Sequence, residues 1–222
     1  MPVRAHPKRF VLALLLLSLG AGRLLPLAPA SPSAPTWLIV PGVRAGPLTA
    51  NTDLHSLVQM FGSVNAREAE VRLGEGEPRS GVVIFPRDPA RRAEIQWKEP
   101  NRKRLPEAII VTADETYKSL WRTQQGITLG TTLRELQQLN GRPFMLTGFD
   151  WDGGGIVTSW RGGRLEKALG EKLMLVLQPA DPDRVRALGR AYATVSGYQK
   201  IRSDYWVMQK LNPRVYQMVV SF

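Results

Sequence analysis

The chain has 222 residues, enough for one sizeable domain or two small ones around a hydrophobic core. It is 43% hydrophobic and 22% charged, a balance typical of globular rather than disordered proteins. The absence of cysteine excludes disulfides, thiolate metal sites and cysteine-linked lipid anchors. With only His6 and His55 present, a multi-histidine metal site is excluded, and Ser-His-Asp chemistry would have to use His55 alone. We therefore expect no metal ion and no cofactor.

Residues 1–30 have the pattern of a signal peptide. Basic residues at the start precede the apolar run 10–22, which is shorter than the stretch of about 20 residues that a spanning helix needs. The small residues Ala28 and Ala30 then stand where a signal peptidase requires them for a cut before Ser31. The pattern predicts export to the periplasm or the extracellular space, with no transmembrane span after processing. A retained membrane anchor is the alternative.

Removal of residues 1–30 lowers the formal charge from +11 to +7, because 26 basic and 19 acidic residues remain. The basic residues are densest in 87–104, but prolines interrupt this segment and Trp97 is its one aromatic residue. Nucleic-acid binding usually needs stacking aromatic residues or a groove-reading helix. We therefore expect no nucleic-acid partner and interpret the segment as solvated loops beside a strand, with contact to an anionic envelope surface as the alternative.

A short pattern occurs twice, 79 residues apart. Residues 52–62 align without gaps on 131–141 and share a threonine, two leucines, a glutamine and a final glycine. Each copy predicts a short helix that begins at a capping threonine, buries an apolar stripe and ends at the glycine. In the second copy, Thr132 and Glu135 also have the spacing of a capping box. Leu57 and Leu136 occupy matching positions, so we expect both to be buried.

Strand-like segments with alternating apolar and polar residues follow each predicted helix. Such alternation predicts antiparallel strands with one buried face. A further helix is expected to begin at Asp181-Pro182, a cap followed by a proline at the first helical position. The expected strands are 69–73, 81–85, 93–98 and 108–112 after the first helix, and 144–149, 156–160, 173–177, 205–210 and 215–222 after the second.

The predicted fold class is therefore α+β, with two helix-plus-antiparallel-sheet repeats after a cleaved signal peptide. A flexible leader is expected at 31–36, the first repeat at 37–114 and the second at 115–222.

Residues 127–143 read I-x-L-G-T-T-x-x-E-L-x-x-L-x-G-x-P. This stretch resembles the repeat signature of the β-lactamase-inhibitor-protein-like fold, which small lipoproteins of outer-membrane protein assembly share. The resemblance implies tandem helix-plus-sheet repeats that bind other proteins. The first copy lacks the glycine before its threonine and the proline after its helix, and the cysteines of the lipoproteins and of the inhibitor are absent. The chain also resembles an uncharacterised bacterial secreted family with the motif G-F-x-W-D-x-G-G, which implies no function.

The loop 150–155 contains Asp150, Trp151, Asp152 and three glycines between two expected strands. It does not match an EF-hand, because a glycine and an arginine stand where ligands are needed, and it lacks the lysine and following helix of a phosphate site. Three interpretations remain: a hairpin turn that needs glycines and aspartates, a binding loop, or a pair of catalytic carboxylates.

The tryptophans on the expected strands, Trp97, Trp160 and Trp206, alternate with polar residues and are expected in the core. If one sheet face were exposed, such residues would be good anchors for a protein partner, and Trp160 would then join Asp150, Trp151 and Asp152 as a binding residue.

Together these features predict a secreted or periplasmic, non-enzymatic protein that binds another envelope or secreted protein. The alternative is a hydrolase of an envelope polymer that uses Asp150 and Asp152. The shape of the site should separate the two, because catalysis needs a cleft with convergent polar groups, whereas a binding module needs exposed aromatic residues on a shallow face.

Overall fold

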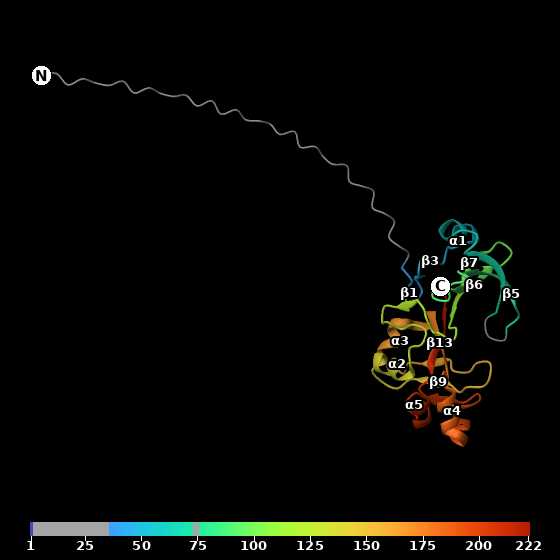
Figure 1. The fold of residues 1–222 in the computed structure, drawn as a ribbon, viewed down its shortest axis with the longest axis vertical. Coiled ribbons are helices and arrows are strands. Elements are labelled where there is room, and N and C mark those ends of the chain that lie inside the picture. Colours follow the sequence, from blue (N-terminus) through green and yellow to red (C-terminus); the bar gives the residue numbers. More distant parts are fainter. Residues whose placement is uncertain (2–35, 73–75) are drawn as a thin grey trace. The chain divides into compact units, whose positions relative to one another are not determined.

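A computed structural model describes Met1, residues 36–72 and residues 76–222 (Figure 1). The chain divides into two units, Met1–Ala34 and Pro35–Phe222, of which the second is compact. The predicted signal peptide, its cleavage point and nearly all of the leader lie outside the described residues. Among the residues that are described, no helix is long and apolar enough to cross a membrane.

The second unit combines short helices with antiparallel sheets, which confirms the predicted α+β class. Its helices are α1 (Leu54–Phe61), α2 (Leu133–Asn140), α3 (Arg164–Leu169), α4 (Pro182–Leu188), α5 (Trp206–Leu211) and two 3₁₀ helices, η1 (Gly170–Lys172) and η2 (Gly189–Val195). Its strands are β1 (Leu38–Val40), β2 (Arg44–Ala45), β3 (Leu48–Thr49), β4 (Ala66–Val71), β5 (Arg79–Ile84), β6 (Ala93–Glu99), β7 (Arg104–Thr112), β8 (Arg122–Thr123), β9 (Met145–Thr147), β10 (Val157–Ser159), β11 (Leu173–Gln178), β12 (Lys200–Arg202) and β13 (Arg214–Val220).

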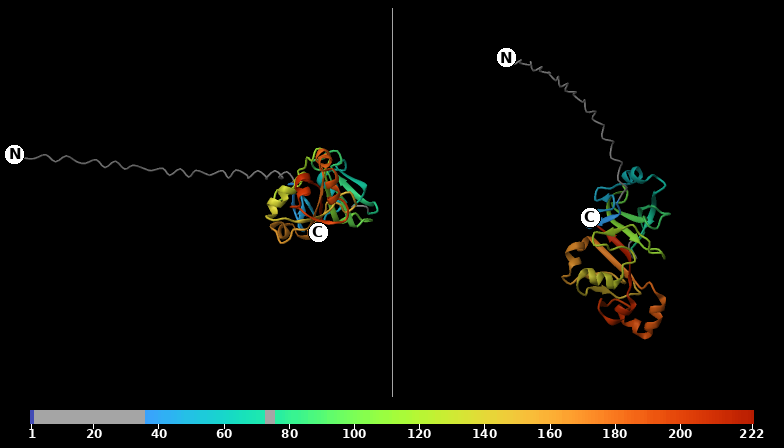
Figure 2. Two further views of the ribbon diagram at one scale, coloured as in Figure 1. Left: turned by 90° about the horizontal axis from the view of Figure 1, so that it is seen from below. Right: turned by 60° about the vertical axis from the view of Figure 1, so that its left-hand side comes forward.

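The largest sheet has six strands in the order β11-β13-β7-β6-β5-β4, and every neighbouring pair is antiparallel. Strands β4 to β7 form the meander predicted after the first helix. Strands β13 and β11 join it from the other half of the chain, with Ile110 opposite Val219 and Ile109 opposite Val220. The two halves of the chain lie toward opposite ends of the unit (Figures 1 and 2) and share this sheet through the β7–β13 pair.

Two smaller sheets complete the unit, in the orders β10-β9-β12 and β3-β2-β1-β8. Strands β9 and β10 form the hairpin expected between 144–149 and 156–160, with Leu146 opposite Val157. A single bridge between Ile156 and Val176 links this hairpin to β11. The turn of the hairpin is the loop 150–155, between the two strands, as predicted.

Both predicted repeat helices are present and both begin with a capping box. At α2 the predicted pair is confirmed: the Thr132 hydroxyl accepts from the Glu135 N–H (3.3 Å), and Glu135 accepts from the Thr132 N–H (2.7 Å). At α1 the cap is Asp53, one residue beyond the expected Thr52, and it accepts from the Ser56 N–H at 2.7 Å. Carboxylate and hydroxyl oxygens both satisfy N–H groups that the first helical turn leaves unpaired.

The starts of α1 and α2 attach to the sheet through matching hydrogen bonds. The first backbone N–H of each helix donates to the carbonyl of the residue that precedes a strand, β7 for α1 and β13 for α2. The N–H of the second residue of that strand donates to the carbonyl of a threonine that precedes the helix. Leu57 and Leu136 are fully buried, as predicted. The four bonds are Leu54 N to Lys103 O (2.9 Å), Leu105 N to Thr52 O (3.2 Å), Leu133 N to Pro213 O (2.8 Å) and Val215 N to Thr131 O (2.8 Å).

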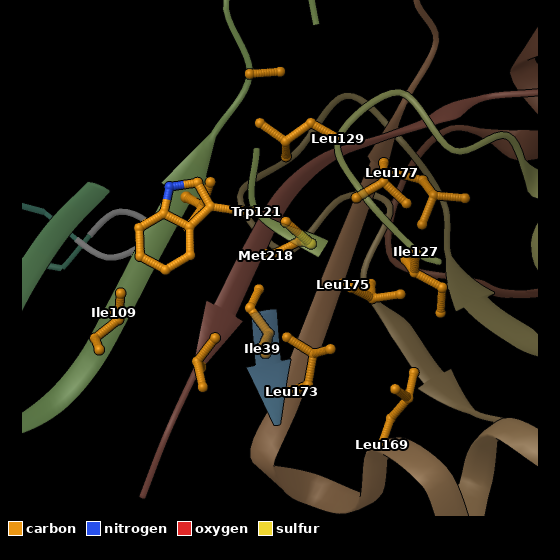
Figure 3. Packing of buried hydrophobic residues seen from close by; sticks show 14 of the residues in the cluster. Ile39, Ile109, Trp121, Ile127, Leu129, Leu169, Leu173, Leu175, Leu177 and Met218 are labelled. Atoms are coloured by element: carbon orange, nitrogen blue, oxygen red, sulfur yellow. The ribbon is translucent and has the colours of Figure 1, made fainter. Parts of the chain in front are cut away.

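The main core lies where β1, β7, β11 and β13 meet (Figure 3). Trp121 is fully buried there, and its indole N–H donates to the carbonyl of Arg91 at 3.2 Å, which satisfies its one polar atom. Leu173, Leu175 and Leu177 alternate along β11 and all point into this cluster. Val71, Ala108, Ile110 and Val219 of the six-stranded sheet form a smaller apolar cluster, separate from the main core. Ala108, Ile110 and Val219 alternate along their strands with residues that point into the main core.

One predicted strand is wrong: residues 205–210 are not extended, because Trp206–Leu211 forms the helix α5. Its buried residues, Val207, Met208 and Leu211, have helical spacing and share one face. Trp206, expected in the core, is consequently half exposed. Asn212 takes the left-handed conformation that ends the helix, with φ of 45°.

Candidate functional site

The loop 150–155 is held against the segment that follows η2. The Phe149 N–H donates to the carbonyl of Val195, and the Gly197 N–H donates to the carbonyl of Phe149, each at 2.8 Å. Phe149 itself is buried, so the loop has an apolar anchor immediately before its first residue. Asp150 follows in the left-handed conformation, with φ of 62°, which aspartate tolerates better than most residues.

The Asp150 carboxylate joins the loop to residues more than forty positions later. One oxygen accepts from the Tyr192 hydroxyl at 3.1 Å and the other from the Ser196 hydroxyl at 2.7 Å. Burial and the neighbouring Asp150 carboxylate raise the pKa of Tyr192 to about 12. Burial disfavours the charged phenolate, and the carboxylate repels a second negative charge. Tyr192 therefore remains a neutral donor at physiological pH, and Asp150 acts as a clamp on the loop.

Trp151 presents an ordered aromatic surface. Its indole N–H donates to the carbonyl of Gly148 at 3.0 Å, and its ring lies 4.3 Å from the ring of Tyr198 at an angle of 47°. Gly153 lies under the indole, since a Cβ there would come within 2.4 Å of the ring. Tyr198 is 78% exposed, so the pair combines a fixed indole with an accessible phenol.

The last glycine of the loop is required by packing against β11. Gly155 has φ of 75°, and a Cβ there would lie 1.8 Å from the carbonyl oxygen of Leu177. Its own carbonyl accepts from the Leu177 N–H at 2.9 Å. The last glycine of the G-F-x-W-D-x-G-G motif thus has a structural role: it lets the hairpin turn approach β11 closely.

The two aspartates do not converge on one cleft. Asp150 lines a pocket of about 590 Å³ together with Tyr192 and Arg186, whose guanidinium also contacts Asp183. Asp152 lines a separate pocket of about 360 Å³ beside Met174 and Tyr216. Trp151, Gly154 and Gln178 line both pockets, so the two pockets adjoin at these residues, and Trp151 is the aromatic one among them.

Trp160 is not brought to this surface. It is 6% exposed, its ring packs 5.1 Å from that of Phe144, and its carbonyl accepts from the Asn140 side chain at 3.0 Å. Trp97 is likewise in the core. Of the four predicted binding residues, Asp150, Trp151 and Asp152 remain together on the loop and Trp160 supports the interior.

Sequence reasoning missed three contributors to the surface: Tyr192, Ser196 and Tyr198. Their partners lie more than forty residues away on the loop, and no short pattern marks such contacts. Sequence reasoning also missed an aromatic pair beside β12, where the rings of Tyr205 and Trp206 lie 6.1 Å apart. This pair borders a third pocket, of about 760 Å³.

The basic segment 87–104 is largely paired with acidic residues. Five of its seven basic side chains form ion pairs with described carboxylates, which leaves a mixed surface rather than an uninterrupted positive one. In the described ranges, no group of three or more His, Asp or Glu is placed to hold a metal ion. The pairs are Arg91–Asp88, Arg92–Glu94, Arg102–Glu99, Arg104–Glu99 and Lys103–Glu68.

No protein-family model, curated protein or solved structure matches the chain significantly, so the geometry of the Trp151 surface is what bears on its role.

Proposed function

We propose that the protein is an exported, non-enzymatic binding module of the cell envelope whose partner is another envelope or secreted protein. The observation that carries the proposal is the Trp151–Tyr198 pair, an aromatic surface held in place before any partner arrives. Tryptophan and tyrosine dominate the binding energy of many protein interfaces. A surface ordered in advance loses little conformational entropy on binding.

The arrangement of the carboxylates favours binding over hydrolysis. A glycoside hydrolase places its acid and its base or nucleophile on opposite sides of one bond, about 5–10 Å apart in a single cleft. Here Asp150 is engaged by two hydroxyl donors, and Asp152 lines a different pocket. An envelope-polymer hydrolase using Asp150 and Asp152 is thus the less favoured candidate.

Partner binding can be tested with the mature protein, residues 31–222, carrying a photoactivatable amino acid in place of Tyr198. We expect it to crosslink one defined protein in envelope extract. For Trp151→Ala, the photoactivatable amino acid is placed at a neighbouring position of the loop. This substitution should reduce the amount of crosslinked product at least about tenfold. Leu120→Ala is the matched control, because Leu120 is an exposed apolar residue that lies outside the loop. Equal crosslinking by Trp151→Ala and wild type would contradict the proposal.

Hydrolysis and export have separate tests. Release of soluble fragments from purified envelope polymer, lost in the Asp150→Asn, Asp152→Asn double variant, would favour the hydrolase. Export predicts a mature protein that starts at Ser31, which intact-mass measurement of the secreted or periplasmic fraction can read directly. A full-length species that stays in the membrane would refute cleavage.

A further inference from the structure

We infer that β12 is a docking edge at which a partner protein adds an extended, acidic segment as a further strand. This inference rests on the proposed function and names the binding mode and the kind of segment bound. Strand β12 ends the sheet β10-β9-β12, so one of its sides has no neighbouring strand. It begins two residues after Tyr198 and ends four residues before Trp206, the two aromatic side chains exposed on either side of it.

The register of β12 shows which backbone groups face away from the sheet. The Gln199 carbonyl accepts from the Gly148 N–H, and the Ser203 N–H donates to the Phe144 carbonyl. Positions that bond to β9 alternate along the strand, so Ile201, opposite Leu146, is also one of them. The residues between them, Lys200 and Arg202, must therefore point their N–H and C=O groups outward.

Three of these outward groups are open to a partner. The carbonyl of Arg202 accepts from the Tyr205 N–H at 3.1 Å. The N–H and C=O of Lys200 and the N–H of Arg202 have no hydrogen-bond partner among the described residues. Both residues are exposed, so an added strand could satisfy all three groups.

A pocket of about 760 Å³ lies beside this edge and can receive side chains of the added strand. Lys200, Ile201 and Arg202 line it along β12, and Tyr205 and Trp206 close it at the start of α5. Backbone pairing with pockets for alternate side chains is the usual architecture of strand addition. Affinity would come from the backbone bonds and selectivity from the pocket.

The charges around the pocket select an acidic segment. Arg202 is neutralised by Asp204 at 2.6 Å, but Lys200 has no carboxylate partner among the described residues. Lys210 lies over the ring of Trp206, 5.4 Å from its centroid, and also has no described ion pair. These two ammonium groups give the edge a net positive charge that glutamate or aspartate side chains would complement.

The probe is a peptide of about seven residues with blocked ends, in which valine and glutamate alternate, a typical strand length. Its match is the same peptide with lysine in place of glutamate. In titrations of isotope-labelled protein, the glutamate peptide should move the amide resonances of Lys200 and Arg202. It should also slow their hydrogen exchange at least about tenfold, while the amide of Ile201 is already protected.

Two variants separate backbone pairing from charge attraction. Lys200→Pro removes an N–H that faces away from β9, so it should preserve the ladder and the melting temperature yet weaken the glutamate peptide about tenfold or more. Lys200→Gln keeps the N–H and removes the charge, so it should weaken binding of the glutamate peptide less than Lys200→Pro does. Lack of binding by the glutamate peptide, unchanged exchange at Lys200 and Arg202, or equal binding of the lysine peptide would each overturn the inference.

The failure of strand addition can be told from the failure of the proposed function. If the crosslinked envelope protein is lost with Trp151→Ala but retained with Lys200→Pro, the Trp151 surface binds a partner and strand addition is refuted. If neither substitution changes the crosslink, both proposals fall. The exchange measurement uses the wild-type chain, so it decides the matter even if the proline variant does not fold.

Discussion

The most direct test of the loop is Asp150→Asn, because the carboxylate forms bonds that an amide only partly replaces. The amide oxygen can keep the Tyr192 or Ser196 hydroxyl as a donor, but its NH₂ group then faces the other hydroxyl, which must turn to accept. A hydrogen bond to a charged group contributes about 1.5–3 kcal/mol when shielded from water, and less at an exposed site such as Asp150. We expect a loss of about 1 kcal/mol in the free energy of unfolding.

Asp150→Ala should cost more, about 2–3 kcal/mol, since both bonds disappear and alanine must adopt a φ of 62°. Asp152→Asn is the matched control: Asp152 is exposed two residues away, and its carboxylate accepts no hydrogen bond among the described residues, so the loss in free energy of unfolding should be near zero.

Urea unfolding at neutral pH measures these differences, and a double-mutant cycle of Asp150→Asn with Ser196→Ala isolates the bond between them. The coupling energy should be about 0.5 kcal/mol or more. A loss with Asp152→Asn as large as with Asp150→Asn, or a coupling of zero, would refute the role of Asp150 as a clamp.

Three further outcomes follow from the packing and from Tyr192. Leu57→Ala and Leu136→Ala should each lower the free energy of unfolding by about 2–5 kcal/mol in urea, since both side chains are fully buried; a loss under about 0.5 kcal/mol would mean that the helix concerned is not packed there. Gly155→Ala should cost at least about 2 kcal/mol by the same assay, because its Cβ would meet a carbonyl oxygen, and a neutral result would contradict the turn geometry. The pKa of Tyr192 is about 12, against an ordinary value of 10.0, so its neutral form stabilises the folded state fully below pH 10, and this stability is lost as the pH rises from there through about 12. Tyrosinate absorbance, compared with Tyr192→Phe, should show this late titration, whereas a normal titration would argue against the contact with Asp150.

Much of the local structure could be predicted because its causes are local. The helices at 54–61 and 133–140 combine a capping residue, an apolar stripe and a terminal glycine within a dozen positions. The strands from β4 to β7 alternate in a meander whose connections are short, so each strand pairs with its sequence neighbour. The loop 150–155 could be placed in a hairpin turn for the same reason.

The helix α5 shows where pattern reading fails. Residues 205–210 are rich in aromatic and β-branched side chains, which favour strands, and Asn212-Pro213 resembles a hairpin turn. In the folded chain the same asparagine ends a helix, and Val207, Met208 and Leu211 are buried in the main core cluster. Burial in this core overrode the local strand preference, and a short window of sequence does not show which core a segment will meet.

The tertiary structure alone decided what the candidate site is. The sequence by itself identified the Asp150, Trp151 and Asp152 loop as a turn with three possible roles. It could not show that Asp150 meets Tyr192 and Ser196, that Trp151 packs against Tyr198, or that Asp152 lies in another pocket. The physical reason is that local hydrogen bonds and periodicity act over a few residues, whereas these contacts join segments more than forty residues apart and exist only once residues 192–198 have folded back over the hairpin.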